Sequence, residues 1–277
     1  MERKICSTKD YLVTGEEFDI IWNSENQIGR TVPFPEKSTA SKYYKSSEYL
    51  SHKDSSVKAI NRLYFFSRFI MFGYKMNILQ KYIKKEENIL DFGCGSGEFL
   101  KRMSVRYKAY GVEPFFKPKT DLLGAQNRIK RSWSSTFPKK FKVICLWHVL
   151  EHLYEVDKQL LKFYSHLEDD GALVFALPNM KSFDAVKYSS FWAGYDAPRH
   201  LWHFTELGIV KKLKKFNFKL VEVKPLFLDS LYVSYLSEKH KKNLFPLIKG
   251  VFWGIISNII ALRTGEYSSK IYIFKKT

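Results

Sequence analysis

Cysteine is scarce in this sequence: only Cys6, Cys94 and Cys145 occur among 277 residues, and they lie far apart. An odd and scattered set does not make a disulfide framework and is typical of a reducing compartment. The opening segment is polar and leads into no apolar stretch of the kind that secretory signals contain, so we expect a cytoplasmic protein. A chain of this length buries enough surface to fold without disulfides or a metal.

Acidic residues are outnumbered, with 28 Asp and Glu against 46 Lys and Arg, which gives a formal net charge of +18. The basic residues form short, separate groups rather than one stripe interleaved with aromatics, so this pattern does not favour nucleic acid as a partner. An acidic substrate, an anionic membrane surface at which the protein makes peripheral contact, and a merely solvated lysine-rich surface all stay open. Long apolar runs are also missing, apart from residues 244–262. Polar residues and glycines interrupt that run, and it is therefore expected to form a buried or interfacial helix rather than a membrane span.

Residues 1–55 differ in character from the rest of the chain. The sequence Val32-Pro-Phe-Pro35 interrupts regular structure, since proline lacks a donor and restricts the residue before it. Residues 17–22 predict a short strand, and apolar positions three and four residues apart predict a long helix over 57–85. We therefore expect an N-terminal appendage over 1–55 and a main domain over 56–277.

From Asn88 onward, strands and helices are expected to alternate. The patterns predict strands near 89–90, 109–113, 142–147, 171–177, 218–223 and 269–277, with helices near 98–107, 155–167 and 206–215. This alternation predicts an α/β fold with a doubly wound, mostly parallel sheet. A helical insertion is expected at about 229–265.

The most informative stretch is Ile89-Leu-Asp-Phe-Gly-Cys-Gly-Ser-Gly97. A buried strand leads into glycines at 93, 95 and 97, whose missing Cβ lets the backbone turn tightly and lets a ligand approach. A dinucleotide fingerprint would require a third glycine at position 98, where the sequence has Glu98. A P-loop is excluded because no Gly-Lys-Ser/Thr follows. A nicotinamide oxidoreductase is therefore the weaker alternative.

Two acidic residues flank this loop. Asp91 precedes the first glycine, and Glu113 ends the next strand, where a carboxylate in a doubly wound sheet reaches a ribose. Acids around a glycine loop suit a ligand that carries positive charge. Together they describe a pocket for S-adenosylmethionine, whose product after methyl transfer is S-adenosylhomocysteine.

At these residues the chain resembles the class I S-adenosylmethionine-dependent methyltransferases, over about residues 85–277. The similar segments are Asp91–Gly97, Glu113, Phe141–His152 and Leu167–Asn179. Within the family, Trp147–His152 and Pro198–Thr205 resemble the branch of ubiquinone-type O-methyltransferases and sugar methyltransferases. The resemblance implies a seven-stranded, Rossmann-like sheet.

The resemblance also implies positions for the cofactor. Asp91 and the backbone of Gly93–Gly95 would line the methionine moiety, and Glu113 would hold the ribose hydroxyls. Trp147 and His148 would flank the cofactor where the substrate enters. The full expected set is Asp91, Phe92, Gly93, Cys94, Gly95, Gly97, Glu113, Trp147 and His148.

A hydroxyl acceptor needs a base, and histidine is suited to that role. The candidates are His148, His152, His200 and His203. His203 is the first, because related sugar methyltransferases have a histidine before Phe-Ser/Thr, and His200 and His148 follow. Tyr195, Arg199 and Trp202 are expected to line the substrate pocket, with Arg199 able to clamp an anionic group.

No metal site is expected from the sequence. Some relatives carry a small zinc ribbon near the N-terminus, but Cys6 stands alone here and the four ligands of a closed zinc site are missing. Tyr43, Tyr44, Tyr49 and His52 form either a lid over the cofactor or a packed helix face.

The sequence therefore predicts a methyltransferase for a small-molecule acceptor such as a sugar, a quinone or a lipid precursor. Two alternatives remain: a methyltransferase for a lipid-linked or nucleic-acid substrate, and a non-catalytic cofactor-binding module. The methylated atom stays open between oxygen, nitrogen and carbon, and the last two can dispense with a protein base.

Overall fold

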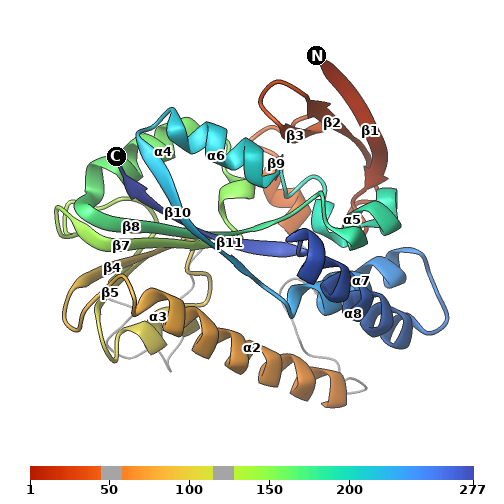
Figure 1. The fold of residues 1–277 in the computed structure, drawn as a ribbon. Helices are drawn as coiled ribbons and strands as arrows, with labels where there is room; N and C mark the ends of the chain where they lie inside the picture. Colours follow the sequence, from red (N-terminus) through yellow and green to blue (C-terminus); the bar gives the residue numbers. More distant parts are fainter. Residues whose placement is uncertain (45–57, 115–127) are drawn as a thin grey trace.

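The main sheet has seven strands, shown in Figure 1 of this computed structural model, which describes residues 1–44, 58–114 and 128–277. They are β4 (Asn88–Phe92), β5 (Lys108–Val112), β6 (Ile129–Lys130), β7 (Phe141–Trp147), β8 (Leu167–Pro178), β10 (Phe218–Pro225) and β11 (Ser269–Lys276). Their order is β10-β11-β8-β7-β4-β5-β6, and β11 alone runs antiparallel to its neighbours. The expected mostly parallel, doubly wound sheet is confirmed. The strand order reverses between β4 and β7, which is where such sheets bind ligands.

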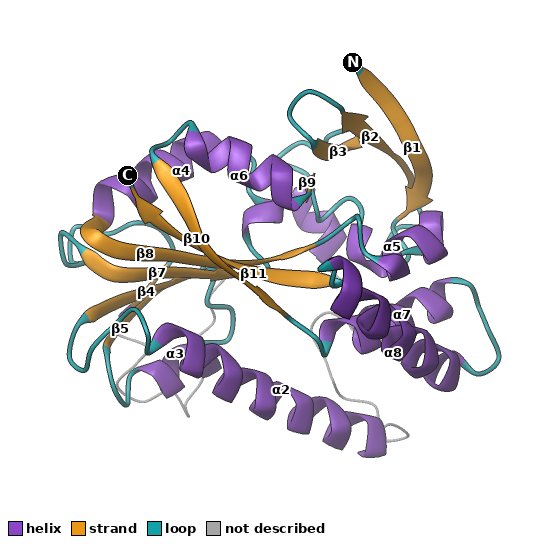
Figure 2. Cartoon of the chain, in the orientation of Figure 1, coloured by secondary structure: helices purple, strands orange, loops and turns teal. Residues whose placement is uncertain are grey.

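Helices cover both faces of this sheet (Figure 2). One face is covered by α4 (Val156–His166) and α6 (Glu206–Lys214), which bury residues such as Leu160 and Ile209 against it. The other face is covered by α2 (Lys58–Leu79) and α3 (Glu98–Met103), with Leu79 and Phe99 in a second core. Because β7 and β8 are buried from both sides, they carry almost continuous apolar runs.

A second, antiparallel sheet lies at the N-terminus. It contains β1 (Glu2–Lys9), β2 (Glu17–Asn23) and β3 (Ile28–Val32), and its fourth strand is β9 (Trp202–Phe204). Residues Ile28–Arg30 of β3 pair with β9, which belongs to the main domain. The sequence predicted only the β2 strand. The N-terminal appendage therefore shares a sheet with the main domain.

The insertion between β10 and β11 is a helical hairpin of α7 (Asp229–His240) and α8 (Pro246–Thr264). The backbones of its helices approach closely, since a Cβ on Gly250 would lie 2.4 Å from the Tyr235 Cα. Its base is fixed by the fully buried Asp184, which accepts hydrogen bonds from the Ser257 and Ser268 hydroxyls at 2.7 Å each. Asp184 belongs to α5 (Phe183–Tyr188). Among the helices searched, within the described residues, α8 is the one that is long and apolar enough to cross a membrane.

Short helices also lie in the described part of the chain: η1 (Ala40–Tyr44), η5 (Leu150–His152), η6 (Ser189–Phe191) and η7 (Ala193–Tyr195). Tyr43 in η1 is buried against Phe18 and Ala197, and its hydroxyl donates to Glu16 at 2.7 Å. This is the packed arrangement, one of the two that the sequence left open for this tyrosine. Tyr49 and His52 lie outside the described residues.

Candidate active site

The glycine loop (residues 93–97) follows β4 and leads into α3. Gly93, Gly95 and Gly97 all have positive φ angles, of 80°, 53° and 78°. A Cβ on Gly93 would lie 2.3 Å from Val149 Cγ2, so this glycine is required by a protein contact. At Gly95 a Cβ would meet nothing within 4 Å among the described atoms. The loop is therefore open to a ligand at Gly95, whereas Gly93 serves packing.

Asp91 lies beneath this loop and is only 2 % exposed. The Cys145 thiol donates a long hydrogen bond to it, with Sγ 3.6 Å from Oδ1. Burial raises the pKa of Asp91 to about 7, although the charge of Lys75 opposes the shift. A further cation at this place would favour the ionised carboxylate.

Glu113, directly after β5, meets the glycine loop. Its carboxylate accepts a hydrogen bond from the Gly95 backbone N–H at 3.0 Å. Cys94 also lies here, with Sγ 2.7 Å from where a Gly111 Cβ would be. The ring of Phe92 points into the core, 5.1 Å from that of Phe163, so Phe92 offers the site only its backbone. The structure thus brings Glu113, Cys94 and the backbones of Phe92 and Gly95 together at the glycine loop.

Trp147 and His148 lie at the end of β7. The Lys75 Nζ atom lies 4.4 Å from the centre of the Trp147 ring. His148 has a φ of 56° and lies between two carboxylates, with Nδ1 3.3 Å from Glu151 Oε1 and Nε2 3.1 Å from Asp229 Oδ2. Burial would lower the pKa of His148, but the two carboxylates outweigh it and raise the pKa to about 9. The two carboxylates therefore favour the protonated form of His148, which makes it a poor candidate for the general base.

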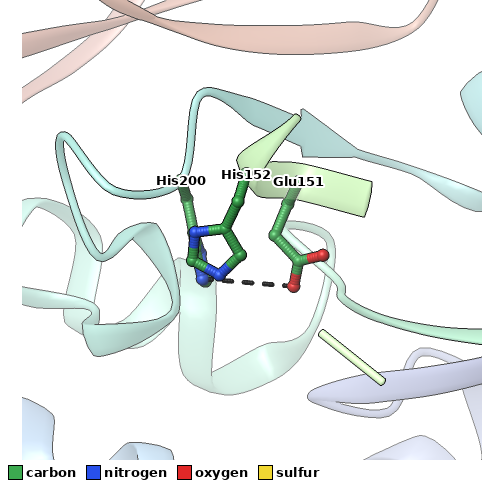
Figure 3. Close-up of side chains that lie close together, drawn as sticks. All are labelled: Glu151, His152 and His200. Atoms are coloured by element: carbon green, nitrogen blue, oxygen red, sulfur yellow. Dashed lines mark ion pairs between the residues drawn. The ribbon is translucent and has the colours of Figure 1, made fainter. Parts of the chain in front are cut away.

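A second group of side chains gathers beside His148, and we call it the histidine cluster (Glu151, His152 and His200). The first two belong to η5 (Leu150–His152), and His200 comes from the segment before β9. Figure 3 shows the three side chains side by side, with the ion pair from His200 Nε2 to Glu151 Oε1 at 4.0 Å. All three offer a ligand atom within 4.8 Å of the others, so these residues could hold a metal ion.

The sequence interpretation missed the role of Glu151 altogether and weighed His152 only in passing. The signal was present in the spacing of His148, Glu151 and His152, since residues three or four apart lie on one face of a helical turn. His200 was chosen for its neighbourhood, and the structure places it against the other two.

His203 lies on β9, in the shared sheet. It is 4 % exposed, and its Nε2 lies 2.9 Å from the Thr31 hydroxyl. That hydroxyl donates to the His200 carbonyl oxygen, so Nε2 of His203 must be the donor toward Thr31. Burial, followed by the charge of His200, lowers the pKa of His203 to about 3. It is a weaker base than an ordinary histidine.

Arg199 and Tyr195, two of the expected substrate residues, are occupied within the protein. The Arg199 side chain is 1 % exposed and pairs with Asp10 at 3.0 Å and Asp196 at 2.6 Å. It also donates to the Tyr43 carbonyl oxygen at 2.9 Å. Tyr195 is 4 % exposed, with its ring 5.0 Å from that of Trp192. Arg199 thereby joins the N-terminal region to the main domain instead of facing a substrate.

Trp202, the third expected substrate residue, lines a groove of about 860 Å³. Its indole N–H donates to the Leu153 carbonyl oxygen at 2.8 Å. The other groove residues include Tyr154 and several lysines of α6 and the turn after it. Of the three residues, Trp202 is therefore the one that reaches a surface hollow.

A family described as "Methyltransferase domain" matches residues 64–223, which is more than half of the chain. The chain belongs to this family. The resemblance to class I S-adenosylmethionine-dependent methyltransferases is thereby confirmed, and with it the expectation of an enzyme. A search of curated proteins finds no match.

Among solved structures, the chain is similar to a SAM-dependent methyltransferase from Archaeoglobus fulgidus. The two are 19 % identical over 76 % of this chain and 94 % of that one, with a TM-score of 0.49. A cyclopropane synthase from Mycobacterium tuberculosis is 14 % identical over 70 % and 79 % of the chains, with a TM-score of 0.45. A phosphoethanolamine N-methyltransferase from Haemonchus contortus, solved with S-adenosylhomocysteine, is 14 % identical over 74 % and 52 %, with a TM-score of 0.47.

Proposed function

We propose that the protein transfers a methyl group from S-adenosylmethionine, bound at the glycine loop, to a small-molecule acceptor. One observation carries this proposal: Asp91 and Glu113 lie on either side of a loop that is open at Gly95. When bound, the cofactor supplies a methyl group on a positively charged sulfur that a nucleophile can attack. The buried Asp91 carboxylate stabilises positive charge, and Glu113 exchanges its bond to Gly95 for bonds to the ribose hydroxyls.

The acceptor binds on the side of Trp147 and His148, where the histidine cluster handles the proton of its hydroxyl. Among the three histidines expected to serve as base, His148 lies between two carboxylates that favour its protonated form, and His203 is hydrogen-bonded to Thr31. His200 is best placed, since its Nδ1 donates to the Gly194 carbonyl oxygen at 2.9 Å and Nε2 keeps its lone pair. The cluster at the end of β7, rather than His203, is therefore our choice for this step.

The cofactor is tested by calorimetric titration of the full chain with S-adenosylmethionine and S-adenosylhomocysteine, with NAD as the control. We expect micromolar binding of both sulfur compounds and none of NAD. Binding of NAD alone would replace this proposal with an oxidoreductase, and absence of all binding would favour a non-catalytic module.

The base is tested by comparing His200→Ala with His203→Ala once an acceptor is found. We expect His200→Ala to lose turnover by a factor of ~100 or more while cofactor binding is kept. His203→Ala is expected to lose less turnover, because His203 lies where β9 pairs with β3 and its removal disturbs packing there rather than proton transfer. A greater loss of turnover in His203→Ala, with cofactor binding intact, would restore His203 as the base.

A second candidate acceptor, a lipid-linked substrate at a membrane surface, is favoured by the exposed face of α8. Large apolar side chains repeat there every three or four residues: Phe245, Ile248, Phe252, Ile255, Ile259 and Leu262, exposed by 48–75 %. Monomeric soluble proteins rarely expose so long an apolar stripe.

The charge around this stripe favours an anionic bilayer as its occupant. Lys239, Lys241, Lys242 and Lys249 are all exposed at one end of the α7–α8 hairpin, and residues 239–265 contain no Asp or Glu. Amphipathic helices with apolar and basic residues bind in the interfacial plane of anionic membranes.

Co-sedimentation with vesicles tests this second candidate. We expect the full chain to pellet with anionic phosphatidylglycerol vesicles at low salt, and less with neutral phosphatidylcholine. The double variant Ile248→Ser/Ile255→Ser should lose pelleting, while Val105→Ser, which changes an exposed valine outside the stripe, should keep it. A chain that ignores vesicles and dimerises through α8 would overturn the membrane candidate.

A further inference from the structure

The imidazole rings of the histidine cluster are held in one orientation by the backbone. His152 Nδ1 lies 2.9 Å from the Arg199 carbonyl oxygen, and His200 Nδ1 lies 2.9 Å from the Gly194 carbonyl oxygen. A carbonyl oxygen only accepts, so both Nδ1 atoms carry the hydrogen and both Nε2 atoms hold a lone pair when the rings are neutral. Metal-binding histidines are oriented by this kind of second bond.

Glu151 supplies a buried carboxylate to the histidine cluster. The residue is 1 % exposed, and within the described part of the chain neither carboxylate oxygen accepts a hydrogen bond. Its Oε1 atom lies 3.3 Å from His148 Nδ1 and 4.0 Å from His200 Nε2, so this oxygen faces the histidines of the cluster. The His148 imidazole offsets part of this buried charge, and a cation bound between Glu151 and the two histidines would stabilise it further.

We propose that Glu151, His152 and His200 bind one divalent transition-metal ion, for which Zn²⁺ and Mn²⁺ are suitable probes. Two imidazole nitrogens and one carboxylate oxygen are a donor set that these ions accept, and three protein ligands leave a coordination position open. Metal–ligand bonds of ~2.0–2.2 Å bring ligand atoms to roughly 3–4 Å from one another. The present separations of up to 4.8 Å therefore need only small side-chain rotations.

The ion would have a chemical task in the proposed methyl transfer, and that task rests on the proposed function. An acceptor hydroxyl bound to the ion loses its proton to solvent more readily, as metal-bound water does. The acceptor oxygen then bonds to the methyl carbon while the carbon–sulfur bond breaks and its electron pair stays on sulfur. With an ion present, His200 acts as a ligand and no protein base is needed. This departs from the expectation, drawn from the sequence, that the protein binds no metal.

The ion is tested on the full chain, treated with a chelator and then titrated with Mn²⁺ by electron paramagnetic resonance and with Zn²⁺ by metal analysis after desalting. We expect one ion of either kind per chain. Glu151→Gln, His152→Gln and His200→Gln should each weaken binding by at least ~10-fold, the loss seen when even a supporting partner is removed.

The matched control is His166→Gln, at the far end of α4. The Nδ1 of His166 also faces a backbone carbonyl, that of Lys162 at 2.9 Å. Unlike the cluster residues, His166 belongs to no group of possible metal ligands among the described residues. It should bind the ion like the unchanged chain. Titration with S-adenosylhomocysteine reports on folding independently, so variants that keep this binding and lose the ion support the site.

The proposal is overturned if no saturable binding is found, or if folded cluster variants bind as well as the His166→Gln control. A protein that binds the ion but no S-adenosyl compound would keep the metal site and reject the proposed methyl transfer. A protein that binds S-adenosylhomocysteine but no ion would keep the proposed methyl transfer and reject the metal site. His200 would then remain the base.

Discussion

The glycine loop and the histidine cluster are built in different ways although both lie at the same end of the sheet. The loop is made of backbone, with three left-handed glycines and one carboxylate bonded to a main-chain N–H. The cluster is made of side chains from two segments about fifty residues apart, held by carbonyl oxygens. The loop is therefore sensitive to steric changes, whereas the cluster depends on the contacts that hold residues 194–200 in place.

The largest effect is expected at the support of the cluster, from Arg199→Met. Removing one partner of a buried, multiply paired charge leaves Asp10 and Asp196 uncompensated and should cost about 3–5 kcal/mol of stability. Urea denaturation measures the loss. The control Arg30→Met breaks an exposed pair with Glu2, in which both side chains are at least 40 % exposed, and should change stability far less. Equal losses would mean that Arg199 does not hold the two regions together.

The next largest effect is the loss of stability in Gly93→Ala, which should exceed the loss in Gly95→Ala. In Gly93→Ala the new Cβ meets Val149 at 2.3 Å while φ is 80°, so we expect a loss of about 2–4 kcal/mol. In Gly95→Ala only the backbone strain remains, about 1–2 kcal/mol. Urea denaturation gives both values. A loss of affinity for S-adenosylhomocysteine in Gly95→Ala, measured on folded protein, would mark Gly95 as the ligand contact. A larger loss of stability in Gly95→Ala than in Gly93→Ala would contradict the loop geometry.

A smaller effect is expected from Glu113→Gln, which leaves the fold intact and weakens bonds to the ribose. Charged hydrogen bonds contribute ~1.5–3 kcal/mol, so affinity for S-adenosylhomocysteine should fall by roughly 10- to 100-fold in a calorimetric titration. Glu86→Gln is the control, since Glu86 is exposed and lies just before the start of β4, at the end away from the glycine loop. An unchanged affinity in Glu113→Gln would remove Glu113 from the proposed pocket.

The smallest and most gradual effect is the pH dependence that the Asp91 carboxyl gives to the affinity for S-adenosylmethionine. With its pKa raised to about 7, the Asp91 carboxyl is protonated below that pH, and a cationic cofactor must displace the proton. Affinity for S-adenosylmethionine should therefore weaken as pH falls below 7, by up to about tenfold per pH unit, and level off above it. Titrations at several pH values measure the slope. In Asp91→Asn the slope due to this group should vanish, and a slope that persists unchanged would place its origin elsewhere.

Much of the main domain was predictable from the sequence because its signals are local. Buried parallel strands such as β7 and β8 contain apolar runs, residues 143–147 and 171–177, and the glycines after β4 mark a tight turn directly. Asp91 and Glu113 were placed by counting along strands. The predicted α3 was longer than the structure shows, since α3 ends at Met103.

The rest depended on contacts between distant residues. β1 alternates poorly and is mostly exposed, and β9 has only three residues, so neither has a strong pattern of its own. Glu151 received no role from the sequence, because nothing in the sequence shows that His200 lies beside it. Arg199 was expected to face a substrate, because nothing in the sequence connects it with Asp10, 189 residues earlier.

The pairing of β3 with β9 also bears on how the chain is made. A ribosome delivers the N-terminal end first, at about 5–20 residues per second, and domains usually fold as they emerge. The edge of β3 has no partner until residues 202–204 have been synthesised, so Ile28–Arg30 remain open to other strands for roughly ten to forty seconds at these speeds. The N-terminal sheet is therefore completed only after β9 has been made, and its open edge must be kept from pairing elsewhere during that time.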